Sequence, residues 1–230
     1  MKITFEGHSC FTITGAKGSV ALIDPFISDN PQCKKEAADF HPDLLLVTHG
    51  HSDHLGDALA IARQADSVLA GPVDLLDNLT LGKISSIGFN IGGVIRFLEF
   101  TVIMTQAIHG SRLPDGKYAG LACGYIISDG QTTVYHAGDT ALFGDMQTVI
   151  SRYPLDFALL PIGGYYTMGP EDAVTAVHWL QPKTVIPMHY NTFPAISQDP
   201  ELFKGAVEDR TEARCLILAP GESVERTVNP

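Results

Sequence analysis

The sequence predicts an α/β protein in which two β-sheets pack together and helices cover their outer faces. Three observations support this fold class. The chain has 230 residues, enough to bury a sizeable core. Each half begins with strand-like segments and continues with mixed strand and helix patterns. Ser/Gly linkers, low-complexity tracts and short repeats are absent from the sequence, so we expect residues 1–230 to form a single domain.

Composition and charge exclude several classes of protein. The 45% hydrophobic and 18% charged fractions are typical of a globular chain rather than a disordered one. With 15 Lys+Arg against 26 Asp+Glu, the formal net charge is −11, which argues against general nucleic-acid binding. The longest uncharged apolar stretch, near Ala119 to Ser128, is far shorter than the ~20 residues of a membrane span. We therefore expect neither nucleic acid nor membrane as a partner.

The cysteines and the N-terminus indicate a compartment. No apolar signal core follows Met1, and no two cysteines form a C-x-x-C pair. A disulfide framework and a cysteine zinc site are therefore not expected. We expect a reduced, cytoplasmic protein. The four cysteines are Cys10, Cys33, Cys123 and Cys215.

The first part of the chain predicts strands. Segments Lys2–Phe5, Cys10–Thr14 and Ser19–Asp24 are short, rich in β-branched and aromatic residues, and separated by glycines. Pro42-Asp43 then opens a run of four apolar residues, Leu44–Val47. Such a run is typical of a strand that is buried on both faces.

Helical spacing follows this buried run. Leu55, Leu59 and Ala62 recur at the helical period, and a second helix-like piece covers Val73–Leu79. From Ile84 to Met104 the pattern returns to strand.

The second half begins with a hairpin and then alternates helix and strand. Asp129-Gly130 supplies the turn of the hairpin within Ala122–His136. Proline suits the first position of two of the later helices. The expected later elements are a helix over Leu142–Ser151, a strand over Leu155–Leu160, a helix over Pro170–Trp179, a strand at Val185-Ile186 and a helix from Asp199-Pro200 to about Val207.

The strongest chemical signal is the segment Thr48–His54, which follows the buried strand directly. It holds three of the nine histidines and one aspartate. His49 and His51 are two residues apart and project to the same side of extended backbone. Asp53 and His54 lie where the next helix is expected to begin. Imidazole and carboxylate suit Zn²⁺, Mn²⁺ or Fe²⁺, so this cluster favours a metal site over a solvated histidine-rich loop.

Further ligands are expected from other strand ends, because one loop cannot surround two ions. His109 follows the strand-like segment Phe100–Thr105, and Asp139 follows Thr133–Tyr135. His189 follows the segment Val185–Met188. Each residue alone is compatible with a surface loop, but together they complete the His/Asp cluster.

These residues resemble the binuclear metallo-β-lactamase superfamily of hydrolases. Additional motifs resemble its uncharacterised metal-dependent hydrolase branch, which is related to the ascorbate-6-phosphate lactonases. The resemblance runs from Ile3 to past Pro200. The motifs are Gly7-His8-Ser9-Cys10-Phe11, Ile23-Asp24-Pro25-Phe26, Ala137-Gly138-Asp139-Thr140, Thr167-Met168-Gly169-Pro170-Glu171-Asp172-Ala173 and Met188-His189-Tyr190-Asn191-Thr192-Phe193-Pro194.

The resemblance implies an αββα sandwich of two mixed sheets, with the site along one edge between them. It also implies two divalent metal ions, with Zn²⁺ favoured and Mn, Fe or Ni as alternatives. Asp24 would support the ligand histidines from behind. The implied ligands are His49, His51 and His109 for one ion, Asp53, His54 and His189 for the other, and Asp139 as the bridge.

The chain departs from this branch at two places. Ser52 stands where glycine is frequent, and a small residue still fits there. Tyr165-Tyr166 stands where a small or amide residue followed by an aromatic is expected. The second departure concerns the substrate rather than the metals.

The ligand set predicts hydrolysis of a small ester, lactone or phosphoester by a hydroxide shared between two ions. The sequence has neither a Gly-x-Ser-x-Gly elbow nor a Walker or Gly-x-Gly-x-x-Gly motif. Asp53 is the first candidate to pass the proton to the leaving atom, and His8 is the second.

The remaining candidates have two interpretations each. His8 either contacts substrate or is a loop histidine that supports Asp24. His136 is expected to support the ligands from behind or to pack. Tyr165 and Tyr166 form either a substrate-facing loop or aromatic packing. Arg112 and Lys117 are either anion contacts or solvated charges.

Three other functions remain alternatives. A nuclease or phosphodiesterase of the same superfamily is disfavoured by the net charge of −11. A diiron redox enzyme would carry a carboxylate in place of His51 and a flavin domain. A non-catalytic metal-binding protein would keep the ligands without turnover. A small-molecule substrate is the expected partner, and a homo-oligomer is compatible with the sequence.

Overall fold

The computed structural model describes residues 1–226, which form two seven-stranded β-sheets. The first sheet contains antiparallel and parallel neighbours, so it is mixed. In spatial order its strands are β14 (Ser223–Glu225), β1 (Lys2–Gly7), β2 (Cys10–Thr14), β3 (Val20–Ile23), β4 (Leu44–Leu46), β5 (Val68–Pro72) and β6 (Ser86–Phe89).

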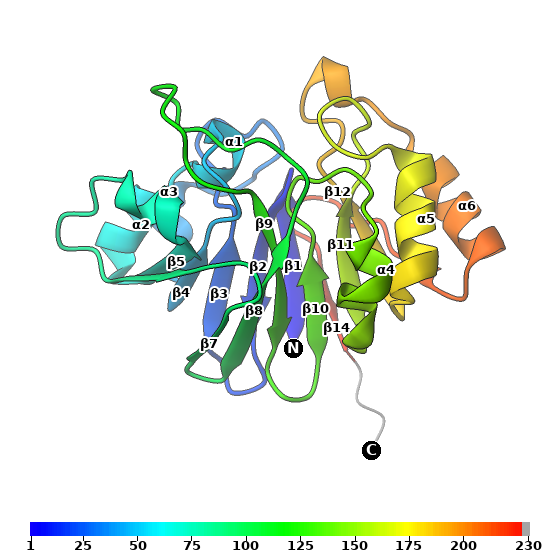
Figure 1. The fold of residues 1–230 in the computed structure, drawn as a ribbon, viewed down its shortest axis with the longest axis horizontal. Coiled ribbons are helices and arrows are strands. Elements are labelled where there is room, and N and C mark those ends of the chain that lie inside the picture. The colour runs from blue at the N-terminus through cyan, green and yellow to red at the C-terminus, as the bar shows by residue number, and fades with distance from the viewer. Residues whose placement is uncertain (227–230) are drawn as a thin grey trace.

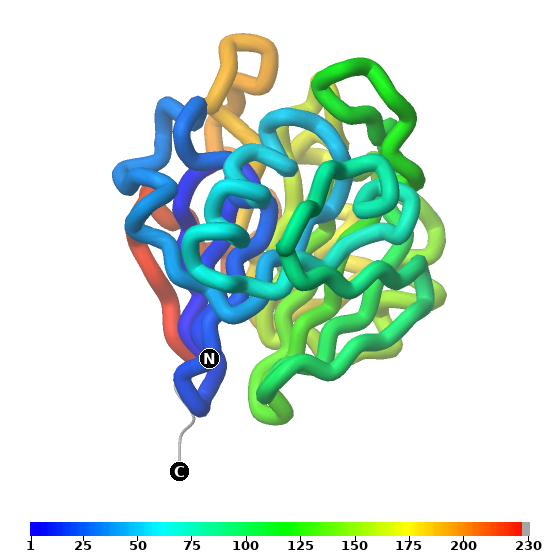
Figure 2. The backbone as a smooth tube through the Cα atoms, turned by 90° about the vertical axis from the view of Figure 1, so that its left-hand side faces the viewer, coloured from blue at the N-terminus to red at the C-terminus, as the bar shows by residue number. Residues whose placement is uncertain are grey.

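The second sheet is mixed in the same way and is formed by strands between residues 94 and 215. Figure 2 shows the two sheets as separate layers, with the blue and red segments in one and the green segments in the other. In spatial order the second sheet consists of β13 (Arg214–Cys215), β12 (Thr184–Met188), β11 (Phe157–Pro161), β10 (Thr133–His136), β9 (Cys123–Ser128), β8 (Phe100–Gln106) and β7 (Val94–Phe97).

Helices cover the outer faces of both sheets. Figure 1 shows α2 and α3 on one side of the pair of sheets and α4, α5 and α6 on the other. The expected αββα sandwich is thereby confirmed. The helices are α1 (Ser52–Leu55), α2 (Ala58–Ala65), α3 (Val73–Asp77), α4 (Asp145–Thr148), α5 (Pro170–Leu180) and α6 (Pro200–Arg210), and the 3-10 turns are Ala37–Asp39, Ile150–Arg152 and Pro194–Ile196.

The main core lies between the sheets and ties them together beneath the candidate metal site. Leu44 and Leu46 of β4 are fully buried, as the apolar run predicts, because β4 lies between two parallel neighbours. Tyr125 of β9 is also fully buried, and its hydroxyl donates to the carbonyl of Val47 at 2.6 Å. This bond joins the second sheet to the end of β4, where the histidine-rich segment starts.

Three segments differ from the expected secondary structure. The strand pattern of Ile84–Met104 is three strands, because a turn at Asn90–Gly93 separates β6 of the first sheet from β7 and β8 of the second. The helical spacing from Leu55 to Ala62 is divided at Gly56 into α1 and α2. Leu142–Ser151 forms only the short α4 followed by a 3-10 turn.

Three strands were not predicted: β5, β13 and β14. Glycine and proline interrupt the apolar pattern of β5, and the other two are only two and three residues long. No helix within residues 1–226 is long and apolar enough to cross a membrane.

Candidate metal centre

Four connections at one edge of the sandwich carry the seven predicted metal ligands. The segment after β4 carries His49, His51, Asp53 and His54, and α1 presents the last two. His109, Asp139 and His189 follow β8, β10 and β12 respectively. Strands from both sheets end at this edge, which is how residues distant in sequence come together.

The structure brings all seven residues together. Their donor atoms form sets in which every atom lies within 4.8 Å of the others. These sets match the division into two ions and a shared carboxylate, except that His8 joins the second set. Among residues 1–226 the sets are His49, His51 and His109; His8, Asp53, His54 and His189; and His49, His54 and Asp139.

Asp139 lies at the centre of this cluster. Its Oδ1 is 3.2 Å from His54 Nε2, and its Oδ2 is 3.1 Å from His189 Nε2 and 3.5 Å from His109 Nε2. Burial raises the pKa of this carboxyl, but His189 and His54 outweigh burial and hold the pKa well below its usual range. Asp139 is therefore an anion that faces both histidine groups.

Several of the side-chain atoms that face one another in this cluster have no hydrogen-bond partner, as expected of metal ligands. Within residues 1–226, His54 Nε2, Asp139 Oδ1 and His189 Nε2 are buried and have no hydrogen-bond partner of acceptable geometry. Buried polar atoms are normally satisfied, so an unpaired group needs an explanation. A cation between the imidazole nitrogens and the carboxylate satisfies them, and this donor set fits Zn²⁺ and similar ions.

The histidine pair after β4 is kept in the neutral form that binds metals. His49 lies in a fully buried position, and burial lowers its pKa well below the usual value. Its Nδ1 is 3.0 Å from Thr48 Oγ1, and its Nε2 is 2.9 Å from His51 Nδ1. The pKa of His51 is also lowered by burial.

Asp24 lies directly behind this cluster, where it was expected. Its side chain is fully buried. Oδ1 accepts a hydrogen bond from the Thr48 amide at 2.8 Å, and Oδ2 accepts one from the Thr48 hydroxyl at 2.7 Å. Oδ2 is also 2.7 Å from His54 Nδ1. With Nδ1 held in this way, His54 directs Nε2 toward Asp139.

His8 has partners different from those predicted. It is fully buried and does not line the cavity that opens over the candidate ligands, so the ring has no direct access to a substrate in that cavity. It does not support Asp24 either: its Nε2 is 3.2 Å from Asp53 Oδ2, and its Nδ1 is 2.8 Å from Thr192 Oγ1. Burial lowers its pKa to about 4. The neutral ring therefore lies behind Asp53 and orients it.

His136 packs away from the ligand atoms. It is buried, and its Nε2 lies 2.9 Å from the Ser9 carbonyl. Its Nδ1 accepts a hydrogen bond from the Gly138 amide at 3.2 Å. His136 thus links the β1–β2 turn to the segment that carries Asp139.

The segment that contains Arg112 packs closely on the histidine-rich loop. A Cβ on Gly50 would lie 2.7 Å from the Ala119 Cβ and 3.0 Å from the Arg112 carbonyl oxygen, so only glycine fits there. The Gly50 amide donates to Ser111 Oγ at 3.2 Å. This contact fixes Arg112 beside the cluster.

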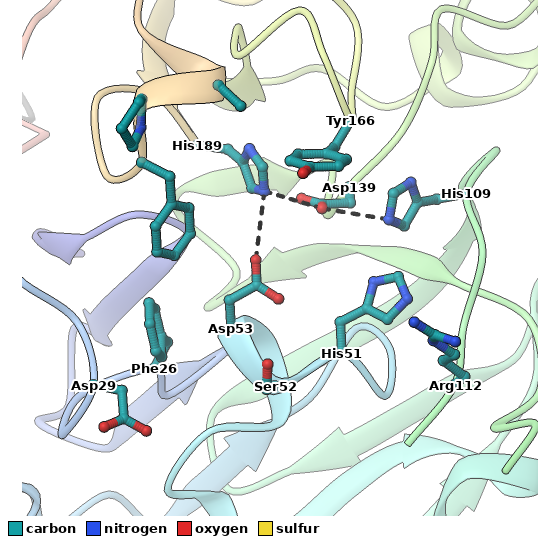
Figure 3. Close-up of a pocket in the computed structure, with 13 residues that line it drawn as sticks. Phe26, Asp29, His51, Ser52, Asp53, His109, Arg112, Asp139, Tyr166 and His189 are labelled. Atoms are coloured by element: carbon teal, nitrogen blue, oxygen red, sulfur yellow. Dashed lines mark ion pairs between the residues drawn. The ribbon is translucent and has the colours of Figure 1, made fainter. Parts of the chain in front are cut away.

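A cavity of about 770 Å³ opens over the candidate ligands. His51, Asp53, His109, Asp139 and His189 face it (Figure 3). Such a volume suits a small-molecule ligand.

Only some of the predicted substrate contacts line this cavity. Arg112 and Tyr166 line it, as do Ser52 and Asp29. Tyr165 is outside the lining and packs edge-on against Tyr166, with ring centroids 4.7 Å apart. Tyr165 is 71% exposed, and its part in substrate binding stays a prediction.

Sequence reasoning missed one wall of the cavity, formed by Phe26, Phe193, Pro194 and Ala195. Both phenylalanines belong to the motifs that carry the family resemblance. Phe26 closely follows Asp24, and Phe193 closely follows His189. This closeness was the available signal, because strand-end loops that carry ligands also build the surrounding walls.

Comparisons with known proteins agree with this geometry. The family model described as "Beta-lactamase superfamily domain" matches residues 2–189. The UPF0173 metal-dependent hydrolase of Pelotomaculum thermopropionicum is 49% identical over 229 residues, covering 98% of this chain and 100% of the relative. That of Methanosphaera stadtmanae is 46% identical, covering 96% and 98%.

A solved structure extends the similarity to three dimensions. Igni18, a metallo hydrolase from the hyperthermophilic archaeon Ignicoccus hospitalis, has a TM-score of 0.90 at 40% identity, covering 99% of each chain. The chain belongs to the metallo-β-lactamase superfamily. Within that superfamily it is a metal-dependent hydrolase.

Proposed function

We propose that this hydrolase uses two divalent ions and a water nucleophile to cleave a small ester, lactone or phosphoester. The position of Asp139 carries the proposal. Its two oxygens lie within 3.1–3.5 Å of His54, His109 and His189, which belong to different ligand sets. A carboxylate can offer one oxygen to each of two cations, so one residue can serve both sets.

In this proposal His49, His51 and His109 hold one ion and Asp53, His54 and His189 hold the other, with Asp139 shared. Imidazole-rich donor sets favour Zn²⁺, with Mn, Fe or Ni as alternatives. When bound, such ions lower the pKa of water from 15.7 to about 7 and so supply hydroxide at neutral pH.

We propose that Asp53 passes the proton to the leaving atom. Burial raises its pKa, but the hydrogen bond with His8 and the nearby His54 outweigh burial and lower the pKa below the usual range. The carboxylate lines the cavity and is 26% exposed, so one face is open to a molecule bound there. His8 Nε2 holds its Oδ2 at 3.2 Å, and Thr192 Oγ1 in turn holds His8 Nδ1.

The side chains near the site support attack by water rather than by a protein nucleophile. Ser9 and Cys10 are fully buried. Ser52 lines the cavity, but no hydrogen bond from its hydroxyl to a base is found within residues 1–226. Serine is a weak nucleophile without an adjacent base.

Single-turnover hydrolysis in ¹⁸O-labelled water tests the proposal, after a screen of a 4-nitrophenyl ester, a lactone and a phosphodiester. We expect turnover of at least one of the three. Label should enter the product in the first turnover, with no covalent adduct detected by mass spectrometry. Ser52→Ala is the control and should retain activity within about twofold. A trapped adduct on Ser52, Ser9, Cys10 or Thr192 would overturn direct attack by water.

A further inference from the structure

The two ends of the cavity have different chemistry. Figure 3 shows Phe26 and Asp29 on one side of Asp53, and His51 and Arg112 on the other. The candidate ligands lie between these ends. A substrate whose reactive bond lies over the ligands therefore extends toward a cation in one direction and toward aromatic rings in the other.

Arg112 has the properties of an anion contact. Within residues 1–226 its guanidinium makes neither an ion pair nor a side-chain hydrogen bond, unlike Lys117 of the same segment, which lies 2.7 Å from Asp115. Its backbone is nevertheless held, because Arg112 pairs with Tyr118 and the adjacent Ser111 hydroxyl accepts from the Gly50 amide. A guanidinium that has no partner in the protein and is carried on a held backbone is suited to a carboxylate or phosphate.

The space around Arg112 can accommodate such a group. A second hollow of about 490 Å³ adjoins the first, and both are lined by His51, Ser52, Asp53 and Arg112. The remainder of its lining is the turn 113–116. Arg112 thus stands where the two hollows meet.

The opposite end is built for an uncharged group. The rings of Phe26 and Phe193 lie 6.3 Å apart at 40°, and Pro194 and Ala195 continue this wall. Phe193 is 37% exposed, so it leaves apolar surface for a ligand to cover. Asp29 lies at the same end and repels an anion there.

We propose that the substrate is an amphipathic anion. Its carboxylate or phosphate group contacts Arg112, its aryl or alkyl group lies against Phe26 and Phe193, and the bond to be hydrolysed lies between them over the candidate ligands. This inference rests on the proposed function of the same site and adds the substrate class and its orientation.

Two matched esters test this inference: the 4-nitrophenyl monoester of glutarate, which carries a terminal carboxylate, and 4-nitrophenyl hexanoate, which is neutral. The wild-type protein should favour the charged ester. Arg112→Gln should lower kcat/KM for the charged ester about tenfold or more and change it less than about twofold for the neutral one. Phe193→Ala should lower kcat/KM for both esters by a similar factor, because both share the aryl group.

Lys117→Gln is the matched control, since it removes the same charge from the same segment. Its ammonium lines neither hollow. The Asp115 carboxylate that it leaves unpaired borders the second hollow but is 51% exposed and screened by water, so the change for either ester should stay below about twofold. An equal loss on both esters in Arg112→Gln, or a selective loss in Lys117→Gln, would overturn the role of Arg112. A wild-type preference for the neutral ester would overturn the substrate class.

Equilibrium binding separates this inference from the proposed reaction. Calorimetry with 4-phenylbutanoate, 4-phenylbutylphosphonate and the neutral 4-phenylbutanamide needs no turnover. Tighter binding of either anion than of the amide, lost about tenfold in Arg112→Gln, supports the inference even if no ester is cleaved, and identifies the preferred oxyanion. Normal ester hydrolysis with no dependence on Arg112 in either assay would overturn the inference and leave the proposed function standing.

Discussion

Individual side chains around the candidate ligands are fixed by hydrogen bonds that determine which atom faces the cluster. Asp24 is the main example, because its carboxylate contacts both Thr48 and the Nδ1 of His54. The seven ligand candidates were predictable because their residue types and strand-end positions are visible in sequence. The partner of His8 was not predictable, because Asp53 is 45 residues away and Thr192 is 184 residues away.

Replacing Asp24 tests whether its carboxylate orients the ligand candidate His54. Asp24→Asn keeps the shape of the side chain but weakens the interaction that orients His54, so metal affinity should fall about 10–100-fold. Competition with a chromophoric chelator measures this change. Asp29→Asn is the control, because that carboxylate lines the cavity without contacting a ligand candidate, and it should leave metal affinity unchanged. Wild-type affinity in Asp24→Asn would contradict the role of Asp24.

Thr192 tests the contact that holds His8. Thr192→Val removes the hydroxyl 2.8 Å from His8 Nδ1 while keeping the shape of the side chain. With His8 free to reorient, Asp53 is less well fixed, and kcat/KM should fall about tenfold at unchanged metal content. Thr192→Ser restores a hydroxyl and should recover most of this loss. If the valine and serine variants behaved alike, Thr192 would have no part in orienting His8.

At the scale of elements, the connections after strands β4, β8, β10 and β12 determine the site. The connection after β4 was predicted well, because four consecutive apolar residues directly precede a dense cluster of ligand-type residues. The pattern from Ile84 to Met104 was misleading, because strand periodicity does not reveal that the chain leaves one sheet and enters the other. Sheet membership depends on long-range pairing, which a local pattern does not contain.

Gly138 links β10 to Asp139 and provides a test of this connection. Its φ is +62°, and a Cβ there would lie 2.4 Å from the Cys123 carbonyl oxygen. Gly138→Ala should therefore destabilise the protein by about 2–4 kcal/mol, from backbone strain and overpacking together, and displace Asp139. Chemical denaturation measures the stability, and metal titration measures the displacement.

Gly130→Ala in the β9–β10 turn is the control for backbone strain alone. Gly130 has a φ of +85° with nothing within 4 Å of a Cβ, so its substitution should cost only about 1 kcal/mol and leave metal binding intact. Equal destabilisation by the two substitutions would show that the close approach at Gly138 has no importance.

At the scale of the whole molecule, two sheets meet at an edge where anionic and imidazole groups are buried together. The layered architecture was predictable from the order of strand and helix patterns, and the αββα arrangement followed from the family resemblance. The aromatic wall of Phe26 and Phe193 was not predicted, because cavity walls depend on how separate loops pack. Burial of so many polar groups makes the stability of the fold depend on what binds them.

Metal removal should therefore destabilise the whole protein. A ligand that binds only the folded state at about 100 times its Kd contributes about 2.7 kcal/mol, so chelation should lower Tm by about 5–10 °C. Differential scanning calorimetry before and after chelation measures this shift, and re-addition of Zn²⁺ or Mn²⁺ should reverse it. An unchanged Tm after verified metal removal would contradict a coupling between the ions and the fold.

Metal stoichiometry tests whether a single carboxylate, that of Asp139, joins two metal sites. Protein purified without chelator and then soaked with Zn²⁺ or Mn²⁺ should contain close to two ions per chain by elemental analysis. Asp139→Ala should retain one ion or fewer, a larger loss than in His109→Ala, because Asp139 faces both ligand sets. Wild-type protein without bound ions after soaking, or an Asp139→Ala variant that binds two ions at wild-type affinity, would contradict a bridging role for Asp139.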